Sequence, residues 1–116
     1  MEKFEPFTIE RPWGTFRQLT HNSLSTVKIH RIKPGAKTSL QSHAKRSEFW
    51  HFESGSGTIV MGDKEYQVGP GDEYTVPVGV KHRWMAGHDG LVLLEVAIGD
   101  FDEEDITRYE DDYGRA

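Results

Sequence analysis

Four side chains near the middle of the sequence are of types that bind metal ions. Gln41 and His43 stand two residues apart, so in an extended segment both point to the same side of the chain. Glu48 follows a short polar stretch, and His82 lies much further along the sequence. Imidazole nitrogens, a carboxylate and an amide oxygen are all ligands for divalent metals. These residues predict one metal site if the fold brings their segments together.

The neighbours of Glu48 favour this interpretation. Glu48 begins an alternating segment in which Trp50 and Phe52 point to the same side, and both are large and apolar. A carboxylate on that side becomes buried, and burial of an unpaired charge is costly. A bound metal ion would remove that cost. Ligands of these types suit Zn, Mn, Fe, Co or Ni, so the identity of the metal stays open.

The composition excludes several other kinds of site. The chain has no cysteine, so it has no disulfide, thiolate metal site or cysteine nucleophile. The net charge is −5, and the acidic residues gather at 100–112, which we interpret as a solvated terminal segment. The basic residues are scattered, so we expect no nucleic-acid surface. Long apolar runs and a secretory signal are both missing, so we expect no membrane span and a cytoplasmic protein.

Short β-rich runs must position the predicted ligands. Each run is bounded by Gly, Pro, Asn or Asp, and this close spacing is typical of a β-sandwich or barrel. The expected strands cover residues 13–19, 26–33, 48–53, 58–61, 65–68, 73–76, 82–85 and 91–98. The Gly62-Asp63 pair predicts a hairpin turn, and residues 101–106 predict a short C-terminal helical turn with Asp102 as its N-cap. A chain of 116 residues has room for one core, so we expect a single domain over residues 1–116.

The spacing of these residues resembles the two sequence motifs of the cupin superfamily. The first motif covers residues 35–55, with Gln41, His43 and Glu48, and the second covers residues 71–86, with His82. Every spacer fits, and the one departure is Gln41, where most cupins have a histidine. The resemblance implies an all-β, single-domain cupin fold, also called a double-stranded β-helix or jelly-roll barrel. It also implies that these four residues bind one divalent metal ion.

Further matches resemble the cupin domain of type II mannose-6-phosphate isomerases. They are the Gln-x-His-x-x-Arg-x-Glu-x-Trp string that begins at Gln41 and the ending at residues 104–115. Family members usually have three consecutive histidines where this chain has His43-Ala44-Lys45. Many are also fused to a sugar nucleotidyltransferase domain, whose glycine-rich loop is not found here, so we expect no synthesis of GDP-mannose by this chain.

The resemblance implies an enzyme that interconverts mannose 6-phosphate and fructose 6-phosphate with the help of the metal. This reaction needs a base and a cationic contact to the phosphate of the sugar. The alternative is a metal-binding cupin of other function, either a non-catalytic sugar-binding or regulatory module or another small-molecule enzyme, because a fold does not fix a function.

Four further residues are candidates for the isomerase chemistry. Arg46 lies between two predicted ligands near the pocket mouth, where it would hold the phosphate or polarise a sugar oxygen of the substrate, although a surface arginine at a turn explains it too. Glu95 shares one side of its strand with Leu91 and Leu93, so a raised pKa would suit it as a base, and a structural ion pair is the alternative. Arg11 and Lys28 are candidate phosphate contacts, and salt bridges on strands explain them equally well.

The N-terminal segment predicts a homodimer. Residues 4–16 include Phe4, Phe7, Ile9, Trp13 and Phe16 and carry few charges. A small open barrel leaves strand edges with unpaired backbone groups, which proteins usually pair or cover. We expect the segment to pair with a second copy across a two-fold axis, and folding back on its own barrel is the alternative.

Overall fold

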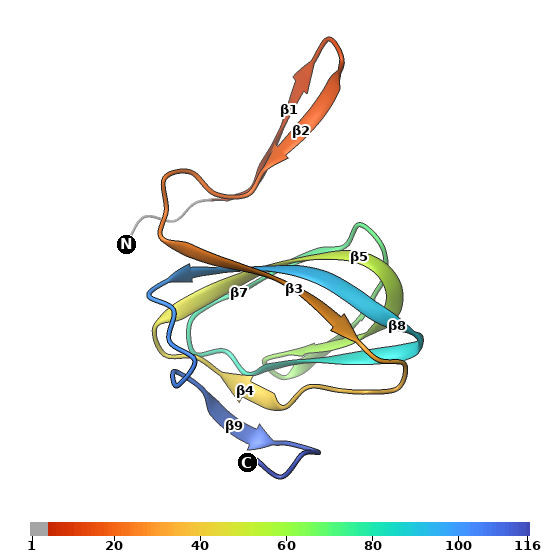
Figure 1. The fold of residues 1–116 in the computed structure, drawn as a ribbon, viewed down its shortest axis with the longest axis vertical. Helices are drawn as coiled ribbons and strands as arrows, with labels where there is room; N and C mark the ends of the chain where they lie inside the picture. Colours follow the sequence, from red (N-terminus) through yellow and green to blue (C-terminus); the bar gives the residue numbers. More distant parts are fainter. Residues whose placement is uncertain (1–4) are drawn as a thin grey trace.

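The computed structural model describes residues 5–116 and contains nine β-strands and no helix within that range (Figure 1). The strands are β1 (Phe7–Arg11), β2 (Gly14–Gln18), β3 (Ser25–Ile32), β4 (Leu40–Ser42), β5 (Arg46–Met61), β6 (Lys64–Val68), β7 (Glu73–Val76), β8 (His82–Gly99) and β9 (Thr107–Glu110). Strands β3 to β9 form a barrel, and β1 and β2 form a separate hairpin. The all-β cupin fold expected from the sequence is confirmed.

Two long, bent strands build the barrel. β5 has 16 residues and β8 has 18, and they pair antiparallel along almost their whole length. The first half of β5 and the second half of β8 lie between β3 and β7. The other two halves lie between β6 and β4, and β9 pairs with β4 at the outer edge. Each long strand therefore contributes to both walls of the barrel.

Glycines allow β5 and β8 to turn the corner between the walls. The register between these strands shifts on both sides of Gly55, which marks β-bulges. Gly55 and Gly90 face each other there with φ angles of +80° and +78°, in the left-handed region that favours glycine. A Cβ atom on Gly55 would collide with the carbonyl oxygen of Gly90. The bend therefore requires glycine at residue 55.

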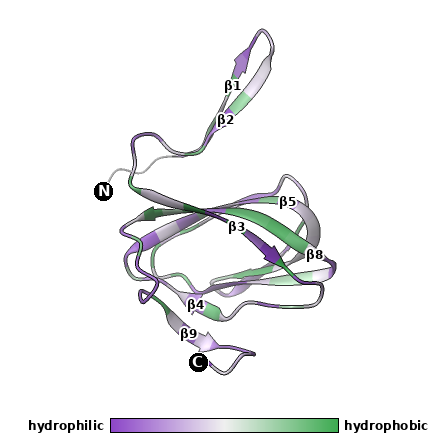
Figure 2. Cartoon of the chain, viewed as in Figure 1, coloured by the Kyte–Doolittle hydropathy of each residue, from purple (hydrophilic) through white to green (hydrophobic). Residues whose placement is uncertain are grey.

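The core lies between the two walls, and alternating residues of β5 and β8 fill it. The fully buried side chains include Trp50, Phe52 and Ile59 of β5 and Leu91 and Leu93 of β8. Figure 2 shows hydrophobic residues along β8, where it crosses the middle of the barrel. Because Glu48 lies two residues before Trp50, the same alternation directs its side chain into the interior.

The hairpin of β1 and β2 extends away from the barrel (Figure 1). In its register Ile9 lies opposite Phe16, and Thr8 lies opposite Arg17, so one face is apolar and the other polar. Near the base of the hairpin, Arg17 forms an ion pair of 2.7 Å with Glu73 of β7. Phe4, which the sequence analysis included in this segment, lies outside the described residues.

Several strands of the structure differ from those expected from the sequence. Residues 48–53 and 58–61 belong to the single strand β5, and residues 82–85 and 91–98 belong to the single strand β8. The hairpin turn at Gly62-Asp63 is confirmed, since Met61 pairs with Lys64. The short strands β1, β4 and β9 had no counterpart among the expected strands. No helix in the described part of the chain is long and apolar enough to cross a membrane.

The prediction of a helical turn at residues 101–106 is wrong. Asp102 does accept a hydrogen bond from the backbone N–H of Glu104, as an N-cap would, but the chain makes only a turn. The carboxylate of Asp105 instead accepts hydrogen bonds from the backbone N–H groups of Ala44 and Lys45, at 2.9 Å each. This contact to a distant loop holds the segment in an irregular conformation that leads into β9.

Candidate metal centre

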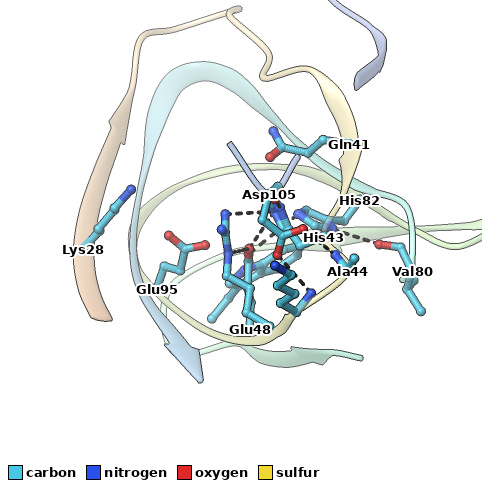
Figure 3. A network of polar contacts seen from close by, with 12 residues as sticks. Lys28, Gln41, His43, Ala44, Glu48, Val80, His82, Glu95 and Asp105 are labelled. Atoms are coloured by element: carbon cyan, nitrogen blue, oxygen red, sulfur yellow. Dashed lines mark hydrogen bonds and ion pairs between the residues drawn. The ribbon is translucent and has the colours of Figure 1, made fainter. Parts of the chain in front are cut away.

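Three of the four predicted ligands meet inside the barrel. His43 follows β4, Glu48 lies in the first half of β5, and His82 is the first residue of β8. Their ligand atoms all lie within 4.8 Å of one another, and all three side chains are buried (Figure 3). Nε2 of His43 is 2.9 Å from Oε2 of Glu48, and Nε2 of His82 is 3.7 Å from Oε1.

Backbone carbonyls fix the orientation of both imidazole rings. Nδ1 of His43 lies 2.7 Å from the carbonyl oxygen of Asp105, and Nδ1 of His82 lies 3.0 Å from that of Val80. A carbonyl oxygen only accepts hydrogen bonds, so each Nδ1 carries the proton and donates. In the neutral rings, the Nε2 lone pairs then point toward Glu48, as in metal sites whose outer partners orient the histidines, and that of His43 also faces Nη2 of Arg46.

The protonation states suit a metal site. Burial raises the pKa of Glu48, but the neighbouring polar groups, first among them His43, outweigh this effect and hold the pKa well below its usual range. Burial lowers the pKa of His82, although the Glu48 carboxylate opposes this. The group therefore offers an ionised carboxylate and a neutral imidazole at neutral pH.

One oxygen of Glu48 shows that the group fits a metal ion. Its Oε1 accepts a hydrogen bond of 2.9 Å from the indole N–H of Trp50. Its Oε2 is buried and has no hydrogen-bond partner among residues 5–116, although Nε2 of His43 is close by. A metal ion between them would stabilise two lone pairs that face each other in a buried site, beside the Arg46 guanidinium at 3.6 Å from Oε2. Nitrogen and oxygen donors of this kind bind Zn, Mn, Fe, Co or Ni.

Gln41 lies next to this group but is held by another residue. It pairs with His82 across β4 and β8, and it lines the same pocket. Its amide nitrogen donates a hydrogen bond of 2.9 Å to the hydroxyl of Ser39. This bond leaves the amide oxygen as the atom that can bind a metal, so the ligand role of Gln41 stays a prediction.

Arg46 lies deep in the pocket, beside the predicted ligands. Its side chain is 7% exposed, whereas a surface arginine at a turn would be open to solvent. It donates a hydrogen bond to the carbonyl of Asp102, and its guanidinium lies 4.3 Å from the centre of the Phe101 ring. Its Nη2 is 3.3 Å from Nε2 of His43. The protein itself therefore fixes the position of this charge.

Glu95 lines the same cavity, on the strand next to the one that carries Glu48 and Arg46. Its register partners are Trp50 of β5 and Lys28 of β3, so all three point to the interior. Figure 3 shows its carboxylate facing the side on which Glu48 lies. Burial raises the pKa of Glu95, and the nearby Glu48 adds to this effect, whereas Nε2 of His30 at 2.9 Å opposes it. Both sequence-based interpretations, a raised pKa and an ion pair, therefore describe this residue.

The two other predicted phosphate contacts lie in different places. Lys28 lines the pocket, where its ammonium lies 2.7 Å from the carboxylate of Glu103 and 4.4 Å from the centre of the Phe101 ring. Arg11 is exposed on the hairpin, where it contacts the carbonyl of Glu10 and packs over Phe16. Arg11 is not among the residues that line this pocket.

The pocket has a volume of about 500 Å³ and a largely polar wall. Sequence reasoning did not assign His30, Trp84 and Arg108, which also line it. His30 was detectable, because it alternates with Lys28 on β3. Arg108 lies in the ending that resembles the isomerases, but nothing in its spacing indicated that it would join the wall of the pocket.

A barrel of two walls that share two bent strands, with an inward-facing His-Glu-His group between them, is a cupin. Oxalate decarboxylase from Bacillus subtilis superposes on 74% of this chain, and on 24% of its own, with a TM-score of 0.68 and 27% identity. A putative sugar phosphate isomerase from Acidithiobacillus ferrooxidans covers 64% of this chain and 49% of its own, with a TM-score of 0.59 and 27% identity.

The chain belongs to the family described as mannose-6-phosphate isomerase C-terminal, whose model matches residues 2–111. Xanthan biosynthesis protein XanB of Xanthomonas campestris pv. campestris (strain B100) is 38% identical over 109 residues, which are 92% of this chain. The match spans only 23% of that relative, so the chain corresponds to about a quarter of its length.

Proposed function

We propose that this protein is a metal-dependent sugar-phosphate isomerase that interconverts mannose 6-phosphate and fructose 6-phosphate. The main support is the cavity beside the buried His43-Glu48-His82 group, because its wall combines cationic side chains with a second buried carboxylate, Glu95. Membership of the isomerase family favours this substrate over others.

The reaction moves one proton between C1 and C2 and another between the oxygens on these carbons. His43, Glu48 and His82, with Gln41 as the predicted fourth ligand, would hold the metal. A divalent metal bound there polarises the sugar oxygens as a Lewis acid. Arg46 adds a fixed positive charge on the same side, where negative charge develops on oxygen as a carbon loses its proton.

Glu95 is the proposed base. It removes the proton from C2 of mannose 6-phosphate and returns it to C1, while the proton on O2 leaves and O1 gains one, so the atoms balance. His30 holds the Glu95 carboxylate through the contact of 2.9 Å, which fixes its position in the cavity. Lys28 is the alternative base, but its ammonium is paired with Glu103.

A metal-binding cupin of other function remains the second candidate. One observation favours it: the chain covers only 23% of XanB, so the relative has a large part that this chain does not match. A sugar-binding or regulatory module would bind the sugar phosphate without converting it. Its signature is therefore binding without turnover.

The test is an isomerase assay of the purified chain, loaded separately with Zn, Mn, Co, Fe and Ni. We expect conversion of mannose 6-phosphate to fructose 6-phosphate with at least one metal, and deuterium uptake at the exchanged carbon in D₂O. The control is the double variant His43→Ala, His82→Ala, which should lose both signals. Tight binding of the sugar phosphate without turnover under every metal would replace the proposed isomerase with the binding module.

A further inference from the structure

A row of three side chains leads from the proposed metal ligands to the outer edge of the barrel. Gln41 of β4 lies opposite His82 of β8 on one side and opposite Arg108 of β9 on the other. Residues that lie opposite one another on antiparallel strands point to the same face. All three line the pocket, so Arg108 belongs to the same cavity as the ligands.

The spacing of this row matches an extended substrate. Opposite residues on neighbouring strands lie about 5 Å apart, so two steps separate His82 and Arg108 by on the order of 10 Å. A hexose 6-phosphate carries its reacting carbons at one end and its phosphate at the other. When C1 and C2 lie beside His82, the far end of the sugar extends toward β9.

Arg108 is a half-buried cation of this pocket that has no anionic partner among the described residues. Its Nε is buried and has no hydrogen-bond partner, and no ion pair within residues 5–116 includes it. The ion pairs of the other cations that line the pocket are Lys28 with Glu103, Lys37 with Asp112, Arg46 with Glu48 and Arg115 with Asp111. Arg31 and Lys33 have no carboxylate partner within residues 5–116 either, but both are exposed to solvent.

A buried guanidinium N–H without an acceptor is costly, so the side chain is poised for an anion that arrives from solution. The planar guanidinium donates two parallel hydrogen bonds to a phosphate, which a single ammonium does not. We infer that Arg108 binds the phosphate group of the sugar phosphate, in the role that sequence reasoning gave to Arg11 and Lys28. This inference rests on the proposed function, because it takes its substrate from it.

The test compares Arg108→Gln with the parent on phosphorylated and unphosphorylated sugar. We expect the KM for mannose 6-phosphate to rise about ten- to hundredfold, as for the loss of a charge-assisted contact, while the weak turnover of mannose stays unchanged. Arg11→Gln is the matched control, since it removes the same charge from the exposed hairpin, and its KM should equal that of the parent. Metal content and melting temperature verify that each variant is folded.

Two further measurements keep the outcome decisive. If Arg108→Gln does not fold, Arg108→Lys takes its place. Lysine retains the charge but loses the planar pair of donors, so the KM should rise above that of the parent by less than the change expected for Arg108→Gln. Calorimetric titration with inorganic phosphate needs no turnover: the parent and Arg11→Gln should bind it more tightly than Arg108→Gln. Equal binding by all three proteins, as expected if phosphate binds only at the ligand group, overturns the inference.

The results also separate this inference from the proposed function. Turnover by the parent with the same KM in Arg108→Gln leaves the isomerase intact and removes the phosphate contact. Loss of phosphate binding in Arg108→Gln, with no turnover by the parent, retains the anion site and removes the isomerase.

Discussion

At the scale of single residues, the site is defined by what each polar atom faces. His43 and His82 each donate a hydrogen bond from Nδ1 to a backbone carbonyl, and this orients Nε2 of each ring toward Glu48. Glu48 in turn keeps one buried oxygen without a hydrogen bond among the described residues. Glu95 lies on the strand next to that of Glu48, where it is held by His30 and does not belong to the ligand group. The two carboxylates therefore have separate roles in the proposed mechanism.

Glu95→Gln tests the proposed base. The amide keeps the size of the side chain and a contact to His30 but does not accept the proton of the sugar carbon. We expect kcat to fall by a factor of about 100 or more with metal content unchanged. A variant that melts at a lower temperature but keeps its kcat would assign Glu95 to a structural ion pair.

At the scale of elements, the sequence predicted most strands but not their connections. The glycines around residue 55 were interpreted as the end of one strand, because glycine usually bounds strands, whereas here it lets β5 bend through the corner. β9 was missed because residues 107–110 follow an acidic run that we interpreted as solvated. Their pairing with β4 depends on contacts between segments far apart in the sequence, which local patterns do not contain.

The candidate site was likewise predictable only where its signals are local in the sequence. Its ligand residues were predictable, because the motif spacing and the alternation around Glu48 are local features. The places of Arg46 deep in the pocket and of Arg108 on its wall were not, because the curvature of the barrel and the path of the terminal segment decide them. That segment also supports the site directly, since the backbone carbonyl of Asp105 accepts a hydrogen bond from Nδ1 of His43 and its carboxylate accepts hydrogen bonds from the loop that follows His43.

Asp105→Ala tests this support. Loss of the carboxylate frees the backbone N–H groups of Ala44 and Lys45, so the loop that carries His43 becomes less ordered. Changes to outer partners of metal ligands typically cost about 10- to 100-fold in metal affinity, and we expect a loss in this range by competition with a chelator. The control is Asp100→Ala, an exposed acid of the same segment. Equal affinities in both variants would contradict the role of Asp105.

The contact between the hairpin and the barrel predicts that the stability of the folded protein depends on pH. Burial raises the pKa of Glu73, but hydrogen bonds from Arg17 and His51 outweigh it, so the pKa lies below its ordinary value of 4.5. A carboxylate with a lowered pKa stabilises the folded state above the ordinary value, and this contribution is lost as the pH falls through the lowered pKa. The melting temperature of the parent should therefore exceed that of Glu73→Gln at neutral pH and approach it under acid conditions. A constant difference down to acid pH would contradict this.

At the scale of the whole molecule, two apolar surfaces favour a homodimer. Trp13 at the tip of the hairpin is 73% exposed, and the outward side chains Val27 and Ile29 of β3 are 58% and 51% exposed. The described structure pairs β3 with β8 alone, so its other edge is open. A two-stranded hairpin is only marginally stable by itself. We expect the hairpin of one copy to cover β3 of a second copy across a two-fold axis.

Light scattering at micromolar concentration tests this assembly. The expected mass is twice the 13.3 kDa of one chain. The double variant Val27→Lys, Ile29→Lys should lower it to the mass of a monomer, because charged side chains on an exposed strand prevent pairing. A parent mass near that of one chain, unchanged on dilution, would contradict the dimer and indicate that the hairpin belongs with the barrel of its own chain.

The metal content of the purified protein tests the central assignment most directly. Elemental analysis of the parent should find about one divalent metal ion per chain, because the buried Glu48 and two oriented imidazoles are stable together chiefly as ligands. The double variant His43→Ala, His82→Ala should contain none, while circular dichroism verifies that it is folded. Equal metal content in the parent and the double variant would contradict the assignment.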